Sequence, residues 1–392
     1  MKHLHGQYFT TSDYLKECVY KLILNDPSVV LEPSVGQGDL VEYISKKRPE
    51  INFDLYEIDK SIKLLPSLKR KKVIYGDFLD QEINYTYYHT IVGNPPYVKT
   101  QNGNLYLDFI RRCYELLRDQ GGELIFIVPS DFIKLTRANN LINEMCSNGS
   151  FTHFIFPNDE NLFDNASIDV TIFRYCKNKF DSVVIVNDEQ KFLINTNGII
   201  TFTDDDPEDT HLVRIEDSFD IFVGMVTGKE SVYKNDEFGN IKVLNGDENK
   251  LDNYILVETF PTGRGELDDY LLSNKETLIS RKIKNFNEKN WFQWGALRNF
   301  QTIKNNLGKE CIYISNLSRK KKVAFKSKVQ YFGGGLIMMI PNQNIELDKI
   351  VTYLNSDVFK SNYMYSGRFK IGHKQLCNAI VANDLVKSII KK

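Results

Sequence analysis

The 392-residue chain lacks the features of several protein classes. Its six cysteines include no C-x-x-C pair, so neither a disulfide framework nor a zinc site is expected. The six histidines form no ligand cluster either, so we expect no metal. No apolar run approaches the roughly 18 residues of a membrane helix, and no apolar stretch follows the first five residues. We therefore expect a protein of the reducing cytoplasm, with no membrane contact and no secretory signal.

The net charge of −1 conceals a strong asymmetry along the chain. Residues 275–392 contain 22 Lys and Arg against 7 Asp and Glu, a net charge of +15, which leaves −16 for residues 1–274. A basic segment is suited to a polyanion such as nucleic acid. A solvated basic face would explain the same charge equally well.

The first half of the chain alternates short apolar strands with helical patterns, which predicts an open, mostly parallel α/β sheet. After residue 150 the pattern changes, and Phe151–Phe156 and Val170–Tyr175 predict an antiparallel pair. The expected parallel strands are 29–31, 53–58, 73–75, 90–92 and 124–128.

A polar stretch, Thr203–Thr210, carries four Asp and one Glu and predicts a domain boundary or an exposed loop. Beyond it the periodicities weaken, while lysines and aromatic residues become more frequent. We therefore expect two domains, residues 1–210 and residues 211–392, of which the second is mixed and basic.

Three strand ends of the first domain carry residues suited to a nucleoside. The first strand runs into Glu32-Pro33-Ser34-Val35-Gly36-Gln37-Gly38, where glycines let a ligand approach the backbone at a helix N-terminus. Glu57 ends the next strand, where a carboxylate can bind ribose hydroxyls. Asp77-Phe78 ends the third and is suited to an adenine ring. The alternative is that the glycines only serve a turn.

Asn94-Pro95-Pro96-Tyr97 follows the fourth expected strand and is the most specific signal in the chain. The two prolines fix the backbone and remove two N–H donors. The Asn94 side-chain oxygen and the Pro95 carbonyl remain as a rigid pair of acceptors for an amino group, and Tyr97 offers a flat face for stacking. A Pro-Pro turn that merely ends a strand is the alternative.

Together these motifs resemble the S-adenosylmethionine-dependent amino-methyltransferases that modify adenine N6 in DNA. The segment Gly6–Thr11 matches the one that packs on the methionine end of the cofactor, and it precedes the glycine loop. This order, followed by a large extra domain, is the γ arrangement of TaqI-type modification enzymes. The resemblance implies a Rossmann-like catalytic domain with a mostly parallel seven-stranded sheet and an antiparallel hairpin, and a C-terminal target-recognition domain.

The resemblance also assigns roles to residues. Asn94 and Pro95 would accept from the target amino group, while Tyr97 and Phe163 would cover the two faces of the target base. The catalytic residues implied are Asn94, Pro95, Pro96, Tyr97 and Phe163. Those implied for S-adenosylmethionine, and for its product S-adenosylhomocysteine, are Tyr8, Thr10, Glu32, Ser34, Gly36, Gly38, Glu57, Ile58, Asp77, Phe78 and Asn94.

The implied activity is sequence-specific methylation of adenine N6 in double-stranded DNA, with the target base flipped out of the duplex. The second domain would then hold the DNA. Candidate DNA-binding residues are basic or aromatic: Trp294, Arg298, Arg319, Lys320, Lys321, Arg368, Phe369 and Lys370. Among them, Trp294 fits the core of the domain equally well, and Phe369 is a candidate wedge.

Other activities and partners stay open at the level of sequence. Methylation of adenine in structured RNA is one alternative, because charge does not distinguish RNA from DNA. Methylation of a glutamine amide in translation release factors is another, although the extra domain of those enzymes usually precedes the catalytic one. A nucleic-acid-binding protein without catalysis is a third. By resemblance we expect a monomer in a restriction–modification system, with a separately acting restriction endonuclease as a candidate partner.

Overall fold

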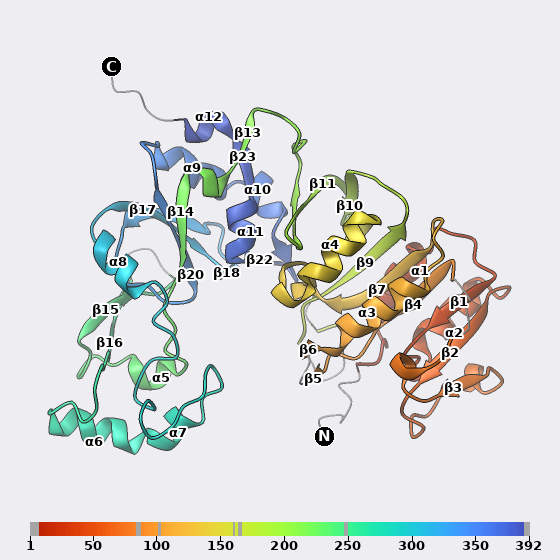
Figure 1. Cartoon of the computed structure of the whole chain (residues 1–392), viewed down its shortest axis with the longest axis horizontal. Coiled ribbons are helices and arrows are strands. Elements are labelled where there is room, and N and C mark those ends of the chain that lie inside the picture. Colours follow the sequence, from red (N-terminus) through yellow and green to blue (C-terminus); the bar gives the residue numbers. More distant parts are fainter. Residues whose placement is uncertain are drawn as a thin grey trace. The chain divides into compact units, whose positions relative to one another are not determined.

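The chain divides into two compact units (Figure 1). Unit 1 comprises Met1–Asp209 and Met364–Arg368, and unit 2 comprises Thr210–Tyr363 and Phe369–Lys392. The structure is a computed structural model. It describes residues 8–83, 88–100, 103–159, 161–163, 167–246 and 250–387.

Unit 1 is built on a ten-stranded sheet with the order β12-β11-β10-β8-β9-β7-β4-β1-β2-β3. Strands β3, β2, β1, β4 and β7 are parallel, and β9 lies antiparallel between β7 and β8. The strands are β1 (Val29–Glu32), β2 (Asn52–Glu57), β3 (Val73–Tyr75), β4 (Thr90–Gly93), β7 (Glu123–Pro129), β8 (Gly149–Ile155), β9 (Val170–Lys177), β10 (Val183–Val186), β11 (Glu189–Thr196) and β12 (Ile199–Thr203). A short hairpin of β5 (Lys99–Thr100) and β6 (Gly103–Asn104) lies apart from this sheet.

The expected mostly parallel sheet with an antiparallel pair is confirmed, and three further strands extend it. β10 pairs with β8 in parallel, and β11 and β12 then follow as hairpins. The two turns use Asn187-Asp188 and Asn197-Gly198, all four with positive φ. Two-residue turns of this kind match the twist of paired strands, and Asn, Asp and Gly adopt them readily.

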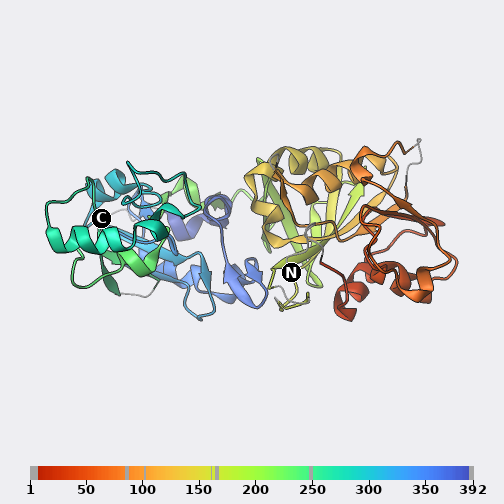
Figure 2. The ribbon, with the colours of Figure 1, turned by 90° about the horizontal axis from the view of Figure 1, so that it is seen from below.

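Helices cover both faces of this sheet (Figure 2). On one face, α1 and α2 pack with the strands around a core that includes Val19, Ile44 and Ile125. Ser12 caps α1, its hydroxyl accepting from the Leu15 amide. The helices are α1 (Asp13–Lys21), α2 (Asp39–Lys47), α3 (Leu105–Leu116) and α4 (Asn139–Ser147), with 3₁₀ turns η1 (Pro66–Leu68), η2 (Phe78–Asp80), η3 (Ser130–Lys134) and η4 (Thr136–Ala138).

A buried ion pair ties the parallel and antiparallel parts of the sheet together. Arg174 Nε on β9 donates to Glu123 Oε2 at the start of β7 over 2.7 Å, with side-chain exposures of 5% and 0%. The other carboxylate oxygen accepts from Thr90 Oγ1 of β4 and from the Asn25 amide after α1. Arg174 also donates to Thr152 Oγ1 of β8. One charge pair therefore contacts four strands and the segment that follows α1.

Unit 2 is centred on a four-stranded antiparallel sheet with the order β14-β20-β17-β19. Two smaller pairings, β13 with β23 and β15 with β16, lie outside it. The strands are β13 (Leu212–Arg214), β14 (Phe219–Val223), β15 (Ile241–Leu244), β16 (Leu251–Tyr254), β17 (Glu310–Ser315), β18 (Leu317–Ser318), β19 (Ala324–Lys328), β20 (Leu336–Pro341), β21 (Met364–Tyr365), β22 (Arg368–Lys370) and β23 (Ile380–Ala382), although β21 and Arg368 belong to unit 1.

Short helices and irregular loops surround the strands of unit 2. They are α5 (Glu230–Tyr233), α6 (Gly265–Ser273), α7 (Lys275–Ile279), α8 (Phe300–Asn306), α9 (Leu347–Leu354), α10 (Asp357–Ser361), α11 (His373–Asn378), α12 (Asn383–Val386) and the 3₁₀ turn η5 (Ile215–Asp217). Within the part of the chain that the structure describes, no helix is both long and apolar enough to cross a membrane.

The buried pair predicts a specific loss of stability in Arg174→Met. Removing the guanidinium leaves the Glu123 carboxylate buried without its charged partner, which costs about 3–5 kcal/mol. Both tryptophans, Trp291 and Trp294, lie in unit 2. Denaturant unfolding followed by circular dichroism should therefore show an early transition in the variant, whereas tryptophan fluorescence should keep the midpoint of the wild type.

The control is Arg111→Met, which removes a partner from the exposed pair with Glu144, 44% and 43% exposed. Such a surface pair contributes at most about 1 kcal/mol. Equal effects of the two substitutions would contradict a special contribution of the buried pair.

Candidate active site

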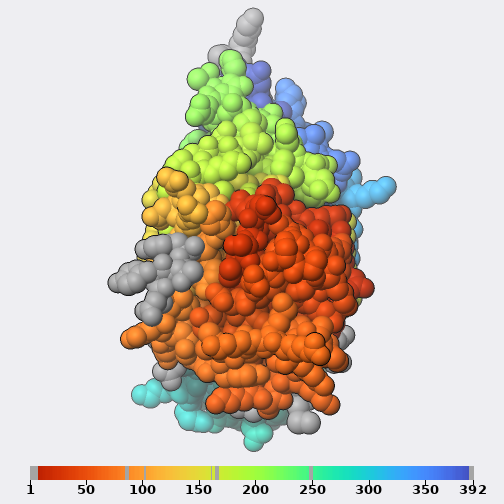
Figure 3. Space-filling model, turned by 90° about the vertical axis from the view of Figure 1, so that its right-hand side faces the viewer, coloured from red at the N-terminus to blue at the C-terminus, as the bar shows by residue number. Residues whose placement is uncertain are grey.

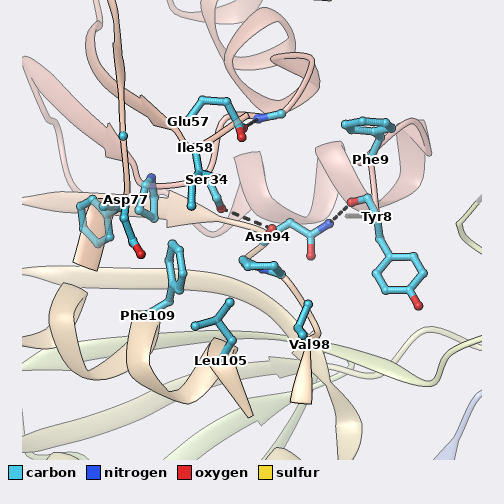
Figure 4. A pocket seen from close by; sticks show the side chains of 15 residues that line it. Tyr8, Phe9, Ser34, Glu57, Ile58, Asp77, Asn94, Val98, Leu105 and Phe109 are labelled. Atoms are coloured by element: carbon cyan, nitrogen blue, oxygen red, sulfur yellow. Dashed lines mark hydrogen bonds between the residues drawn. The ribbon is translucent and has the colours of Figure 1, made fainter. Parts of the chain in front are cut away.

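A pocket lies at the carboxyl ends of the parallel strands β1, β2, β3 and β4 (Figure 4). Open α/β sheets bind ligands at this edge, because the loops after successive strands converge there. The N-terminal segments that contribute to it also form much of the face of unit 1 seen in Figure 3. The predicted site residues that line the pocket are Tyr8, Ser34, Gly36, Glu57, Ile58, Asp77, Phe78, Asn94 and Pro96.

Glu57 fixes the backbone around the pocket. One carboxylate oxygen accepts from the Gly36 amide over 2.8 Å, and the other accepts from the Asp59 amide over 2.9 Å. The side chain is 5% exposed, so it is held in one place between the glycine loop and the end of β2. Each oxygen keeps a lone pair that can accept from a hydroxyl of a bound ligand.

Thr10 and Glu32 line a small cavity that shares Tyr8, Ser34, Gly36 and Asn94 with the main pocket. Glu32 is buried, and one of its oxygens accepts from the Ser34 amide over 3.3 Å. Burial raises the pKa of Glu32 to about 8, and the nearby Glu57 carboxylate acts in the same direction. At neutral pH the Glu32 carboxyl is therefore mostly protonated in the ligand-free protein.

The opposite side of the pocket is apolar. Phe78 stacks on Phe109 of α3 with ring centroids 5.6 Å apart, and Ile58 leaves 49% of its surface exposed at the rim. Asp77 accepts from the Leu79 amide and so caps η2. Sequence reasoning missed Phe9, Val98, Leu105 and Phe109, which also line the pocket. Phe109 is among the buried residues of α3, and nothing in the sequence marked which edge of the sheet it would face.

The Asn94 amide has one defined orientation. Its Nδ2 donates to the Tyr8 carbonyl over 2.8 Å (Figure 4). The same nitrogen also donates to Thr10 Oγ1 over 3.1 Å. A carbonyl can only accept, so the nitrogen must face the N-terminal segment and Oδ1 must face the other way. Tyr97 donates its hydroxyl to that Oδ1 over 2.5 Å and lies 3.1 Å from the Ile127 carbonyl. Burial raises the pKa of the Tyr97 hydroxyl well above its usual value, so the group remains a donor.

Tyr97 and Phe163 meet beside Asn94 together with Tyr8. The ring centroids of Tyr97 and Phe163 are 6.2 Å apart and their planes are at 84°, while Tyr8 lies within 5.7 Å of both. Phe163 is 4% exposed and belongs to the core cluster of α1 and α2. The two rings predicted to cover a base therefore lie next to each other but are not parallel. Gly6 and Gln7 of the segment Gly6–Thr11 lie outside the described residues.

The two glycines of the loop differ in what they face. Gly36, with φ +55°, lines the pocket, and a side chain there would press on the Phe9 ring at 3.2 Å. Gly38, with φ +97°, is the N-cap of α2, and a Cβ atom would lie 2.1 Å from Leu68. Gly38 thus serves the packing of α2 against η1 and is not among the residues that line the pocket, so its contact with a cofactor stays a prediction.

Two of the aromatic candidates in the second half of the chain are core residues, which corrects the prediction of a DNA contact. Trp294 is 3% exposed and donates its indole N–H to the Ile255 carbonyl. Phe369 is 2% exposed and packs near Phe359 and Tyr363. Their size and apolar surface fill the interior of unit 2, and neither is available as a surface contact or wedge in this structure.

The basic candidates are placed differently from one another. Arg298, Arg319, Lys320 and Lys321 are exposed, whereas Lys370 is half-buried. Arg368 is mostly buried and forms an ion pair with Asp169, so its guanidinium is directed into unit 1 and not toward a ligand in solvent.

Lys320 lies in a groove of unit 2 between β19 and α9. Three exposed lysines line it: Lys320, Lys322 and Lys328. A fourth, Lys326, forms ion pairs with Glu310 and Asp348. The groove is therefore lined by four lysines and two carboxylates, which gives it a net positive charge.

Part of this chain is similar to known proteins. Residues 22–163 match the family described as Eco57I restriction-modification methylase. The Type II methyltransferase M.HincII of Haemophilus influenzae is 29% identical over 218 residues, half of this chain and 42% of that protein. The Type II methyltransferase M.MjaIV of Methanocaldococcus jannaschii is 28% identical over 225 residues, 49% of this chain and 74% of that protein.

The chain thus spans about two-fifths of the length of the first curated relatives that it matches. Among solved structures, the Type IIL restriction-modification enzyme MmeI in complex with DNA aligns with 95% of this chain and 62% of its own, with a TM-score of 0.51 and 9% identity, which shows a likeness of fold alone. Unit 1 thus has the predicted Rossmann-like α/β sheet, and residues 22–163 within it are similar to the Eco57I restriction-modification methylase family.

Proposed function

We propose that this chain is a sequence-specific DNA methyltransferase that flips an adenine out of the duplex, methylates its N6 amino group and so protects DNA in a restriction–modification system. The observation that carries the proposal is the fixed Asn94 amide, whose oxygen is directed away from its two hydrogen-bond acceptors at the edge of a nucleoside-type pocket. The family match of residues 22–163 supports methyl transfer as the reaction.

The residues present fit S-adenosylmethionine. Glu57 is placed to accept from the ribose hydroxyls, and Ile58, Phe78 and Asp77 form an apolar slot with one carboxylate for the adenine. The buried Glu32 beside Thr10 suits the ammonium group of the methionine part, because a cation relieves the cost of ionising a buried carboxyl. When bound, the cofactor supplies an electrophilic methyl group on its sulfonium and leaves as S-adenosylhomocysteine.

Asn94 and Pro95 act on the target amino group. Two acceptors, the Asn94 oxygen and the Pro95 carbonyl, would each accept a hydrogen bond from one amino hydrogen. These hydrogen bonds would disfavour conjugation of the nitrogen lone pair with the ring. Tyr97 would stack on one face of the base and Phe163 on the other. Since these rings lie at 84° and in contact with Tyr8, admission of a base requires them to move apart.

Unit 2 supplies the contacts to DNA in this proposal. Flipping a base costs a few kcal/mol of unstacking, which contacts to the surrounding phosphates must offset. The groove with Lys320, Lys322 and Lys328 is the described surface best suited to phosphates, and the exposed Arg319, Lys321 and Arg298 extend the positive charge of this unit.

The direct test incubates the chain with S-adenosylmethionine labelled on its methyl group and, in parallel, with unmethylated genomic DNA, total RNA and a release-factor preparation. We expect label in DNA only, recovered as N6-methyladenine after digestion. Label in RNA or in protein would replace the proposed substrate, and another methylated base in DNA would replace adenine.

Asn94→Ala should lower kcat on genomic DNA by roughly 10²–10³-fold, the effect of losing one preorganised hydrogen-bonding group in a catalytic site. DNA affinity, measured by filter binding, should stay within about twofold. Thr10→Val removes one of the two acceptors that hold the Asn94 nitrogen and leaves the Tyr8 carbonyl in place. It should give a smaller loss of kcat, and normal turnover by Asn94→Ala would refute the assigned role.

Binding of S-adenosylmethionine should release close to one proton at pH 7. In the free protein Glu32 has a pKa of about 8 and is mostly protonated at this pH; beside the ligand ammonium it should ionise. Affinity should therefore rise with pH between about 6 and 8. Calorimetry in buffers of different ionisation enthalpy measures the released proton, and Glu32→Gln should abolish the release while the wild-type chain shows it.

The same pKa has a consequence for folding. Because the folded state holds a proton on Glu32 that the unfolded state loses near pH 4.5, the ligand-free protein should lose stability as pH rises from about 4.5 to 8. Glu32→Gln should remove this part of the pH dependence. A wild-type stability that rises across the same interval, with the same slope in the variant, would contradict the assignment.

Substitution of the groove lysines should reduce the salt dependence of DNA binding. Lys320→Gln with Lys322→Gln should weaken binding to duplex DNA and lower the slope of log K against log salt by roughly 2, about one for each phosphate contact. The matched control is Lys229→Gln with Lys304→Gln, which removes the same charge from exposed positions of unit 2 outside the groove. Identical slopes for the two pairs would place the phosphate contacts elsewhere.

A further inference from the structure

A short piece of the late chain is part of unit 1. Met364–Arg368 belongs to this unit, although the residues before and after it belong to unit 2. It forms a tight turn in which Ser366 and Gly367 both have positive φ, 47° and 69°. The turn lies against Asn158, whose carbonyl oxygen is 3.4 Å from the position of a Cβ atom on Gly367.

Tyr365 packs at one end of the stretch that carries Phe163. Its ring meets Phe156, the residue that follows β8, edge-on with centroids 4.9 Å apart. Lys134 Nζ lies over the same ring, 4.8 Å from its centroid. Tyr365 is 2% exposed, so this contact is part of the interior of unit 1.

Arg368 binds at the other end of that stretch. Its Nη2 donates to Asp169 Oδ1 over 2.6 Å, immediately before β9 begins at Val170. The two side chains are 18% and 11% exposed, so the pair is largely shielded from water, where a charge pair matters more than on the surface. The Asp169 carbonyl also accepts from the Ser130 amide, which ties this end to the end of β7.

We propose that Tyr365 and Arg368 are positioning residues for the target base, because they hold both ends of the stretch from which Phe163 reaches the aromatic cluster beside Asn94. Phe163 lies seven residues after Phe156 and six before Asp169, and its ring is 6.2 Å from that of Tyr97. The proposal rests on the function proposed above. In this proposal a turn from the second half of the chain supports the site of the target base. This role replaces the DNA contact predicted for Arg368.

The test asks whether Arg368 acts through Phe163. Steady-state methylation of unmethylated genomic DNA is measured for the wild type, Arg368→Ala, Phe163→Ala and the double variant, with S-adenosylmethionine affinity measured by calorimetry. Arg368→Ala should lower kcat about tenfold, which corresponds to about 1.4 kcal/mol, and leave cofactor affinity within twofold. In the Phe163→Ala background the same substitution should change kcat by less than twofold, because the ring that it positions is already absent.

Three further variants guard against a loss of folding. Asp169→Asn weakens the same contact from its other side and should show the same dependence on Phe163. Arg368→Lys keeps the charge and should restore part of kcat. Arg111→Ala, which breaks an exposed pair with Glu144 in the same unit, should leave kcat unchanged.

The outcomes separate this inference from the proposed function. An active wild type in which the effects of Arg368→Ala and Phe163→Ala multiply would overturn the positioning role and leave the proposed function intact. A tenfold rise in the cofactor dissociation constant of Arg368→Ala would also overturn it, since the effect would then lie in the cofactor pocket. A wild type that binds the cofactor and labels no DNA would overturn both.

Discussion

The buried pair of Glu123 and Arg174 is the interaction on which the order of unit 1 depends. It fixes three neighbouring strands at one end: β4 through Thr90, β7 through Glu123 and β9 through Arg174. The opposite ends of β4 and β7, and the residue preceding β9, supply Asn94, the Ile127 carbonyl and Asp169. Because strands are stiff over a few residues, fixing their register at one end of the strands sets the relative positions of the groups at the other end.

The site is completed by segments distant in sequence. Tyr8 and Thr10 precede the first strand, yet they set the orientation of Asn94. Tyr365 and Arg368 come near the end of the chain, yet they lie against the residues on either side of Phe163. The sheet itself contributes Glu57 and Asp77 from consecutive strand ends. The strand ends of the sheet thus provide the part of the pocket assigned to the cofactor. Two segments from outside the sheet border the part assigned to the target base.

The sequence was most informative where local chemistry determines structure. Short apolar runs predicted the parallel strands, and the strand-end residues Glu57, Asp77 and Asn94 line one pocket, as their positions implied. Tertiary packing decided the rest. Trp294 and Phe369 look like surface candidates in a basic segment, but their apolar area fills a core; Phe109 faces the pocket because of how α3 lies on the sheet. The strands β10 to β12 were not predicted, although the turns that join them, Asn187-Asp188 and Asn197-Gly198, are of a type typical of hairpins.

The hydroxyl of Tyr97 has a single hydrogen and two acceptors within reach, the Asn94 oxygen at 2.5 Å and the Ile127 carbonyl at 3.1 Å. A ligand amino group that donates to the Asn94 oxygen would compete with the Tyr97 hydroxyl. The hydroxyl would still have an acceptor. The hydroxyl hydrogen can rotate to the Ile127 carbonyl of β7. The free-energy cost of giving up the Asn94 oxygen is therefore the difference between two hydrogen bonds and not the loss of one. Tyr97 thereby keeps the oxygen occupied while the site is empty and can yield it without leaving a buried polar group unsatisfied.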